Sequence, residues 1–268
     1  EYVRAWTIQL LNDASKASSR MQNRFLKMAR SDPSPVVRLY LASAVQKTKP
    51  SVAWRICDAL ARHEEDEDDR YLPKMIWFGL AELMKDDPDR AFRLVGKSRM
   101  DVLSDYAIWF GAKLQGKALD RSLKTLASAK NKEPVIEAVA LGLKGQRGLE
   151  MPRQWKSVSK KLYASSNAQV AKLSRVIGST FGDTSLYPDM RTTLADTGAP
   201  LEDRRAAFSI LSDANDPESV DLIISLLDDA AFTTAVIELA PQLNRPDMAE
   251  LLIERFDQFS EKDKGAAI

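Results

Sequence analysis

The stretch HEEDEDDRYLPKMIW, residues 63–77, contains residue types that bind metals and transfer protons: one histidine followed by six acidic residues. The six acids, termed the acidic loop, are Glu64, Glu65, Asp66, Glu67, Asp68 and Asp69. The first letters begin like the zinc motif H-E-x-x-H, but residue 67 is a glutamate, so the second histidine ligand is missing. The stretch also departs from an EF-hand calcium loop, because it has no turn glycine and Trp77 occupies the position of the closing glutamate.

Three interpretations of the acidic loop stay open. Glu64, Asp66 and Asp69, together with carbonyl oxygens, could form an irregular calcium site. The loop could instead dock on a basic surface of a neighbouring module. The favoured interpretation is that the six like charges repel one another, stay solvated and end the helix that precedes them. The next helix then starts at Leu72 and Pro73 and buries Trp77.

Two glycine-containing segments fit nucleotide-binding motifs only in part. AFRLVGKS, residues 91–98, matches a loose P-loop pattern with alanine in place of the first glycine. A phosphate cradle needs a glycine-rich turn between a strand and a helix, whereas the preceding DDPDRAFRL predicts a capped helix. Gly96 is better explained as the residue just beyond that helix, where positive φ costs little. The glycines of GLKGQRG, residues 142–148, are predicted to form a flexible exit from a helix, because their spacing does not fit a dinucleotide-binding fingerprint.

Nucleophilic catalysis has no candidate residues. Cys57 is the only cysteine and has no second histidine to activate it, and His63 has no serine-elbow partner. Cys57, in WRICDAL, is expected to be a small buried residue of a helix. The sequence has no C-x-x-C-H motif for covalent haem attachment. We therefore predict that the chain by itself is not an enzyme and has no catalytic, cofactor-binding or metal site.

Helix-start signals recur along the whole chain, and strand signals are absent. The predicted starts are Ser34 with Pro35, Ser51, Asp87 with Pro88, Asp216 with Pro217, and Arg245 with Pro246. Ser and Asp are favoured N-caps, and proline is tolerated at the first helical position because its missing N–H would have no partner there. No alternating apolar run is bounded by Asn-Gly or Asp-Gly turns. The sequence therefore predicts an all-α protein.

Three predicted helix starts resemble one another and indicate a repeat. VRAWTIQLL starts at residue 3, VRLYLASAV 34 residues later, and RRAAFSILS 201 residues after the first, close to six such periods. The second residue of each of these segments is an arginine: Arg4, Arg38 and Arg205. Short links between amphipathic runs favour stacked antiparallel helix pairs. We predict one α-solenoid of HEAT-like helix pairs over residues 1–268, with degenerate repeats at about 97–182.

The overall charge gives no preference for nucleic acid or membranes. The chain has 268 residues, of which 44% are hydrophobic and 29% charged, and its formal net charge is +1. This composition is typical of a folded domain. No apolar run is long enough to span a bilayer, so we expect no membrane contact. The chain starts at Glu1 inside a predicted helix, and we take it to be a piece of a larger multidomain protein.

One segment is locally basic. Between residues 144 and 175 the cations outnumber the acids by eight to one. Trp155 and Tyr163 lie eight residues apart, at helical spacing, and are expected to face the core with the lysines in water. The predicted basic patch comprises Lys156, Lys160, Lys161, Lys172 and Arg175. HEAT-like DNA glycosylases hold phosphate backbones on such surfaces, so nucleic-acid binding or DNA repair is the alternative function, although an acidic protein surface is favoured.

The order of several segments is specific to one kind of protein. EYVRAWTIQLL, SDPSPVVRLYLASAVQK, ALARHEEDEDDRYLPKMIWFGL, RQWKSVSKKLYASSNAQVAKLSRVIGSTFGD and LEDRRAAFSIL follow one another. This order resembles the HEAT-repeat middle region of bacterial multidomain proteins named membrane-bound dehydrogenases or c-type haem-binding-domain proteins. The resemblance implies a flanking β-propeller and a flanking cytochrome module, with haem only in the latter, and a periplasmic or exported parent protein. This chain would then be a non-catalytic scaffold whose partners are other modules of the same polypeptide or another protein.

Overall fold

The computed structural model describes residues 1–14, 18–146 and 148–267, and these residues form helices and turns without a strand. The all-α prediction is confirmed. The chain divides into two compact units. Unit 1 consists of Glu1–Gln146 and Pro152–Ser174, and unit 2 of Arg147–Met151 and Arg175–Ile268. No helix in the described ranges combines the length and apolar character needed to cross a bilayer.

Unit 1 is built from ten α-helices and part of an eleventh. They are α1 (Tyr2–Asp13), α2 (Ser19–Ser31), α3 (Pro35–Ala44), α4 (Pro50–Leu60), α5 (Leu72–Asp86), α6 (Pro88–Val95), α7 (Asp101–Leu114), α8 (Gly116–Ser128), α9 (Glu133–Leu143), α10 (Arg153–Tyr163) and the first part of α11 (Ala168–Thr180). Two short 3₁₀ helices, η1 (Val45–Lys47) and η2 (Glu64–Asp66), lie between them.

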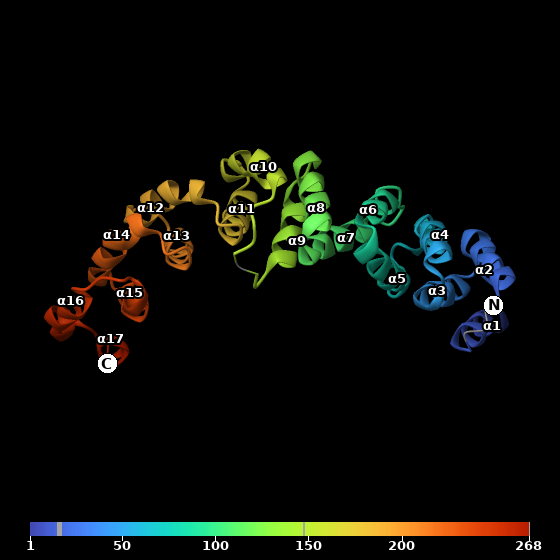
Figure 1. Cartoon of the computed structure of the whole chain (residues 1–268), viewed down its shortest axis with the longest axis horizontal. Helices are drawn as coiled ribbons and strands as arrows, with labels where there is room; N and C mark the ends of the chain where they lie inside the picture. The colour runs from blue at the N-terminus through green and yellow to red at the C-terminus, as the bar shows by residue number, and fades with distance from the viewer. Residues whose placement is uncertain (15–17, 147, 268) are drawn as a thin grey trace. The chain divides into compact units, whose positions relative to one another are not determined.

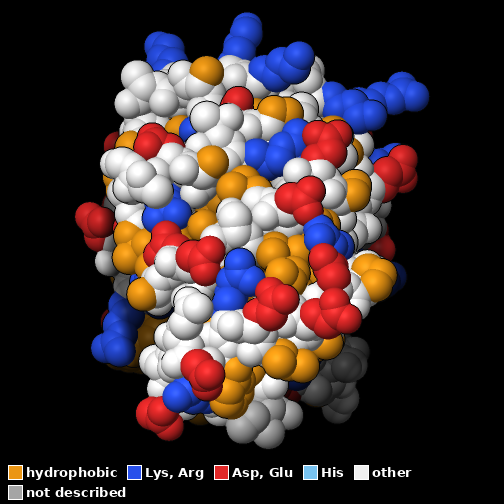
Figure 2. Space-filling model, turned by 90° about the vertical axis from the view of Figure 1, so that its left-hand side faces the viewer, with side chains coloured by type: hydrophobic (Ala, Val, Ile, Leu, Met, Phe, Trp, Pro, Cys, Tyr) orange, Lys and Arg blue, Asp and Glu red, His pale blue; other side chains and the backbone are white. Residues whose placement is uncertain are grey.

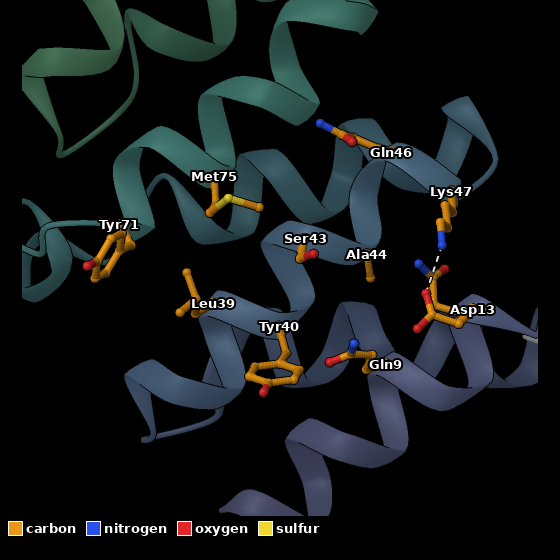
Figure 3. A pocket seen from close by; sticks show the side chains of 11 residues that line it. Gln9, Asp13, Leu39, Tyr40, Ser43, Ala44, Gln46, Lys47, Tyr71 and Met75 are labelled. Atoms are coloured by element: carbon orange, nitrogen blue, oxygen red, sulfur yellow. Dashed lines mark hydrogen bonds and ion pairs between the residues drawn. The ribbon is translucent and has the colours of Figure 1, made fainter.

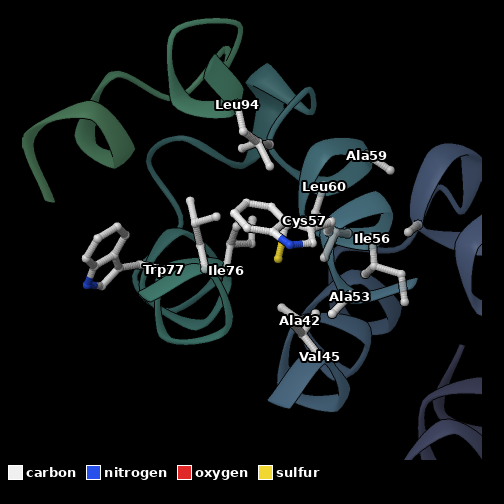
Figure 4. Packing of buried hydrophobic residues seen from close by; sticks show 14 of the residues in the cluster. Ala42, Val45, Ala53, Ile56, Cys57, Ala59, Leu60, Ile76, Trp77 and Leu94 are labelled. Carbon is white, nitrogen blue, oxygen red and sulfur yellow. The ribbon is translucent and has the colours of Figure 1, made fainter. Parts of the chain in front are cut away.

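The helices of unit 1 form two layers (Figure 1). In the odd layer α1 packs on α3, α3 on α5, α5 on α7 and α7 on α9. In the even layer α2 packs on α4, α6 on α8 and α8 on α10. Buried apolar side chains fill the space between the layers, and Figure 4 shows Cys57 and Leu60 of α4 beside Ile76 of α5 and Leu94 of α6. Each helix thus buries one face on its neighbours and leaves the other in water.

Two predicted helix starts are confirmed, and a third is wrong. The Ser34 hydroxyl accepts a hydrogen bond from the Val37 N–H at the start of α3, and Asp87 caps α6 through the N–H of Arg90. Helix α4 instead begins at Pro50, so Ser51 lies inside its first turn and caps nothing. Proline, with its fixed φ and missing N–H, suits the first helical position, so the N-cap is Lys49, two residues before the predicted Ser51.

The remaining local predictions are partly confirmed. Pro217 opens the 3₁₀ helix η4 (Pro217–Ser219), and α16 begins beyond Pro246, at Met248. Gly96 directly follows α6, but its φ of −66° is right-handed, so the expected positive φ is wrong. Gly142 belongs to α9 rather than to a flexible exit, because it packs against α7.

Unit 2 contains the end of α11 and the helices that follow it. They are η3 (Thr184–Leu186), α12 (Tyr187–Ala195), α13 (Leu201–Asp213), η4, α14 (Val220–Ser225), η5 (Leu226–Asp228), α15 (Thr233–Leu239), η6 (Ala240–Gln242), α16 (Met248–Arg255), η7 (Phe256–Gln258) and α17 (Glu261–Ala266). Helix α12 packs on α13, and α15 packs on α17. The ring of Phe208 lies 5.6 Å from that of buried Phe232, and Leu211 and Val236 of the same unit are fully buried. These contacts give unit 2 an apolar core of its own.

Candidate functional site

Asp66, in the middle of the acidic loop, is buried with an exposed fraction of 2%. Its two carboxylate oxygens accept hydrogen bonds from Nε and Nη2 of Arg38, both at 2.5 Å. Arg38 is equally buried, and its Nη1 donates to the carbonyl oxygen of Asp32 at 2.8 Å. The hydrogen bond to Asp66 raises the pKa of the Arg38 guanidinium. The expectation that all six acids stay solvated is therefore wrong at Asp66, because a buried cation compensates its charge.

Other members of the acidic loop also have partners within the chain. His63 Nδ1 lies 2.8 Å from a carboxylate oxygen of Glu65, and this hydrogen bond lowers the pKa of Glu65. Glu67 accepts the N–H of Asp101 at 2.9 Å. One oxygen of Asp69 accepts the N–H groups of Tyr71 and Leu72 at 2.8 Å, which fixes the start of α5. The loop is thus held in place at four positions.

The three candidate calcium ligands are not brought together. Asp66 faces Arg38, Asp69 faces the start of α5, and Glu64 is exposed to solvent. Across the described ranges, no group of three or more His, Cys, Asp or Glu side chains is arranged to hold a metal ion. Glu64 and Asp68 are the exposed acids of the loop whose side chains accept no hydrogen bond from a described residue, so these two are free to meet a partner.

The Arg38–Asp66 pair has an equivalent one helix pair earlier. Arg4 donates to both carboxylate oxygens of Asp32, each at 3.0 Å, and both pairs join residues 28 positions apart. Asp32 also accepts the N–H of Ser34 at 3.1 Å. The sequence comparison identified the two arginines, but not their aspartate partners. Those aspartates lie in loops. Only the packing of consecutive helix pairs shows which arginine each aspartate meets.

The third arginine of the sequence comparison is displaced by one residue. Arg205 is exposed, whereas Arg204 is buried. Arg204 forms an ion pair of 2.9 Å with Asp229 and donates Nε to the carbonyl oxygen of Leu194 at 3.1 Å. The core-facing stripe of α13 contains Arg204, Ala207 and Leu211, and this stripe sets the register.

Several contacts in unit 1 join residues exactly one 34-residue interval apart. These contacts are Lys47 Nζ to Asp13 at 2.7 Å, His63 Nε2 to the carbonyl oxygen of Ala29 at 2.9 Å, the Asp101 N–H to Glu67 at 2.9 Å, and Asn167 Nδ2 to Glu133 at 2.8 Å. Each places one residue beside the corresponding residue of the next helix pair. The interval equals the spacing between the first two helix starts in the sequence.

The predicted basic patch is only partly assembled. Helix α10 presents Lys156, Lys160 and Lys161 to solvent, and α11 presents Lys172. Arg175, three residues after Lys172 on the same helix, is half-buried. Trp155 is fully buried as expected, and its indole N–H donates to the Tyr163 hydroxyl at 3.2 Å.

A larger charge pattern escaped the sequence analysis. The helices of the even layer, α2, α4, α6, α8 and α10, contain fourteen Lys and Arg residues against three Asp and Glu residues. The helices of the odd layer, α1, α3, α5, α7 and α9, contain five Lys and Arg residues against seven Asp and Glu residues. A net charge of +1 for the whole chain conceals this segregation. Sorting the charges by alternate helices would have revealed it.

The even layer also contains the more charged grooves. A groove of about 210 Å³ between α2, α4 and α6 is lined by Arg30, Arg55 and Arg93, by the acid Asp58, and by the largely buried Trp54 and Leu94. The Arg90 guanidinium lies 4.7 Å from the centre of the Trp54 ring. An adjoining groove of about 450 Å³ shares Arg30 and extends towards Arg62 and His63.

A groove in the odd layer is of mixed character (Figure 3). It has a volume of about 400 Å³ and lies between α1, α3 and α5. Tyr40, Met75 and Gln9 point into it, and the Asp13–Lys47 ion pair of 2.7 Å lies at one end. The groove offers apolar and hydrogen-bonding contacts, but no pair of groups arranged for acid–base catalysis.

Ion pairing in unit 2 differs from that in the even layer of unit 1. Four arginines of this unit form ion pairs with acids: Arg191 with Asp216 and Glu218, Arg204 with Asp229, Arg245 with Asp221 and Asp247, and Arg255 with Asp228. In the middle and lower part of the face shown in Figure 2, acidic and basic side chains alternate over short distances with hydrophobic patches between them. In the described part of unit 2, the charges of these four arginines are thus compensated by acids, unlike most cations of the even layer of unit 1.

The two remaining candidates for chemistry are structural. Cys57 is fully buried, and burial raises the pKa of its thiol to about 12, so it is not a nucleophile at neutral pH. Residues 91–95 complete helix α6, and no strand of the described chain precedes Gly96. Compared with models of known protein families and with curated protein sequences, the chain matches none.

Proposed function

We propose that the chain is a non-catalytic α-solenoid of HEAT-like helix pairs that serves as a binding platform for protein partners. The observation that carries the proposal is the set of contacts at the 34-residue interval, because stacked repeats place equivalent residues of successive repeats next to each other. The two equivalent Arg–Asp pairs and the two-layer packing of unit 1 support the same arrangement. One continuous array over residues 1–268 is part of this proposal.

The partner is proposed to be another module of the same polypeptide. This part rests on the resemblance to HEAT-repeat regions of multidomain proteins named membrane-bound dehydrogenases or c-type haem-binding-domain proteins. On that basis the parent protein is exported, and its haem belongs to a flanking module rather than to this chain. The exposed acids Glu64 and Asp68 offer a contact point, because the structural bonds at Asp66 and Asp69 hold the acidic loop in place.

A calorimetric titration of the chain against the separately expressed flanking segments of its polypeptide tests this function. We expect salt-sensitive binding that is weakened about tenfold by the double substitution Glu64→Gln/Asp68→Asn. The control Glu250→Gln/Glu254→Gln removes two exposed acids from α16 and should leave the affinity unchanged. No heat at either low or moderate salt would overturn the proposal of an intramolecular partner.

A further inference from the structure

The cations of the even layer are largely uncompensated. Of the fourteen Lys and Arg residues on its helices, only Arg121 forms an ion pair with a carboxylate in the described parts of the chain, and its partner is Asp89. Helix α2 has no acidic residue at all and contributes Arg20, Arg24 and Lys27 in addition to Arg30. Like charges gathered on one face repel one another and create a positive potential that attracts an anionic partner.

The grooves in this layer suit side chains rather than bases. The groove between α2, α4 and α6 combines the guanidinium groups of Arg30, Arg55, Arg90 and Arg93 with one acid, Asp58, and with the largely buried side chains of Trp54 and Leu94. Arginine favours carboxylate and phosphate through paired N–H donors. The exposed aromatic residues of the chain, by contrast, lie outside the even-layer helices: Tyr2, Trp6, Tyr71 and Phe78. Single-stranded nucleic acid relies on exposed aromatic rings for base stacking, so this face does not fit it.

We propose that the even layer of unit 1 binds an acidic polypeptide segment that contains interspersed apolar residues. The carboxylates pair with arginines such as Arg30, Arg55 and Arg93, and the apolar side chains enter the groove above Trp54 and Leu94. Packed helices lie about 8–10 Å apart, and an extended chain advances about 3.3 Å per residue. An acid at every third position of the segment therefore advances by about one helix spacing where even-layer helices pack directly, as α2 does on α4 and α6 does on α8. This inference rests on the proposed function as a binding platform and names its surface and the class of its partner.

The experiment measures fluorescence anisotropy with the full chain and a labelled 15-residue probe peptide, in which an acid stands at every third position and leucines lie between the acids. A peptide with Gln in place of the acids is the ligand control. The variant Arg30→Gln/Arg55→Gln/Arg93→Gln removes three exposed charges from the even layer. The control variant Lys74→Gln/Lys85→Gln/Lys113→Gln removes three exposed charges from the odd layer. Thermal melts of both variants establish that they remain folded.

We expect the unsubstituted chain to bind the acidic peptide at 50 mM salt. The even-layer variant should bind the peptide at least tenfold more weakly than the unsubstituted chain, and the odd-layer variant less than twofold more weakly. Equal losses in the two variants, or no binding at 50 mM salt, would overturn the inference. Tighter binding of a 20-base-pair DNA duplex than of the peptide, lost in the even-layer variant, would also overturn it and identify nucleic acid as the partner. If the flanking segments bind the chain but the acidic peptide does not, this inference fails while the proposed function stands. If the acidic peptide binds but the flanking segments do not, this inference stands while the proposed intramolecular partner fails.

Discussion

Arg38 and Asp66 have both lost their contact with water, and each compensates the charge of the other. The guanidinium uses two of its nitrogens on Asp66 and a third on the carbonyl oxygen of Asp32. Desolvation of two charges is costly, and a buried pair repays this cost only with good geometry. Asp66 anchors the acidic loop to α3 through this pair. The pair therefore contributes to the folded state mainly by leaving no buried charge alone.

Removal of one partner of this pair should be strongly destabilising. We expect Asp66→Ala to lower the free energy of unfolding by about 3–5 kcal/mol, because the buried Arg38 loses its two hydrogen bonds to a carboxylate and keeps only the exposed Glu65, 3.5 Å from Nη2, as an acidic neighbour. The double substitution Arg38→Met/Asp66→Leu should cost less than Asp66→Ala alone. Urea denaturation of the purified variants measures both values.

The matched control for this prediction is the exposed pair of Arg62 and Asp58, in which Nη2 lies 3.1 Å from the carboxylate. Asp58→Ala should change the free energy of unfolding by only about 0–1 kcal/mol, because water solvates the remaining charge. Equal effects of Asp58→Ala and Asp66→Ala would contradict the role assigned to burial.

Cys57 is predicted to be chemically silent in the folded protein. Its thiol is fully buried in α4, and burial raises its pKa to about 12, so almost no reactive thiolate forms at pH 8. A thiol reagent that changes absorbance on reaction should label less than a tenth of the protein in buffer and all of it in 6 M guanidinium chloride. Rapid labelling of the native protein would show that α4 opens readily.

At the scale of the helices, close packing of three odd-layer helices on their neighbours depends on glycines. Gly79, Gly111 and Gly142 lie in α5, α7 and α9, at intervals of 32 and 31 residues. A β-carbon at Gly79 would meet the side chain of Val45, and one at Gly142 would meet the backbone carbonyl oxygen of Trp109 in α7. A side chain can rotate away from such a contact, whereas a helix backbone cannot. Gly142 therefore fixes how closely α9 approaches α7.

Gly142→Ala tests this packing. Alanine is favoured over glycine inside a helix by about 1 kcal/mol, but here the added methyl group must displace α7. We expect the clash to outweigh the gain in propensity and to destabilise the protein by about 1–3 kcal/mol in urea denaturation.

Gly265, in α17, provides the comparison, since a β-carbon there has no neighbouring atom within 4 Å. Gly265→Ala should leave the stability unchanged or raise it by up to about 1 kcal/mol. If Gly142→Ala stabilised the protein to a similar degree, α9 would not be in tight contact with α7.

At the scale of the whole molecule, acid should destabilise the fold through its hydrogen-bonded carboxylates. The pKa of Glu65 is lowered by its hydrogen bond with His63, that of Asp89 by its hydrogen bond with Arg121, and that of Asp229 by the N–H of Ala231 and by Arg204. Because these pKa values are lower in the folded than in the unfolded chain, the unfolded chain binds protons first as the pH falls. The stability that these carboxylates contribute is fully present above their pKa values in the unfolded chain. It is lost as the pH falls through their lower pKa values in the folded chain.

We therefore expect the free energy of unfolding to change little between pH 7 and pH 5 through these groups and to fall below about pH 4. Urea denaturation at a series of pH values measures this dependence. Glu65→Gln should make the acid dependence shallower, whereas Glu64→Gln, at an exposed neighbour, should not. A stability that increases between pH 5 and pH 3 would contradict the prediction.

The sequence by itself determined the features whose causes are local. Proline and capping residues give α3 and α6 their starts at Pro35 and Pro88, because helix initiation depends on a few adjacent backbone groups. Helical spacing likewise predicted that Trp155 is buried. The all-α class follows from such signals repeated along the chain. The 34-residue interval was also visible, since sequence repetition needs no knowledge of contacts.

Only the tertiary structure decided which distant residues meet. The partner of Arg38, the burial of Asp66 in a run of acids and the choice of Arg204 over Arg205 depend on how consecutive helix pairs pack. The charge segregation required knowing that alternate helices share a layer. Individual charges carry no information about the face on which they gather, because that face is defined by contacts between helices about 30 residues apart. Local chemistry therefore specified the helices, and their packing turned a nearly neutral chain into one with a basic layer.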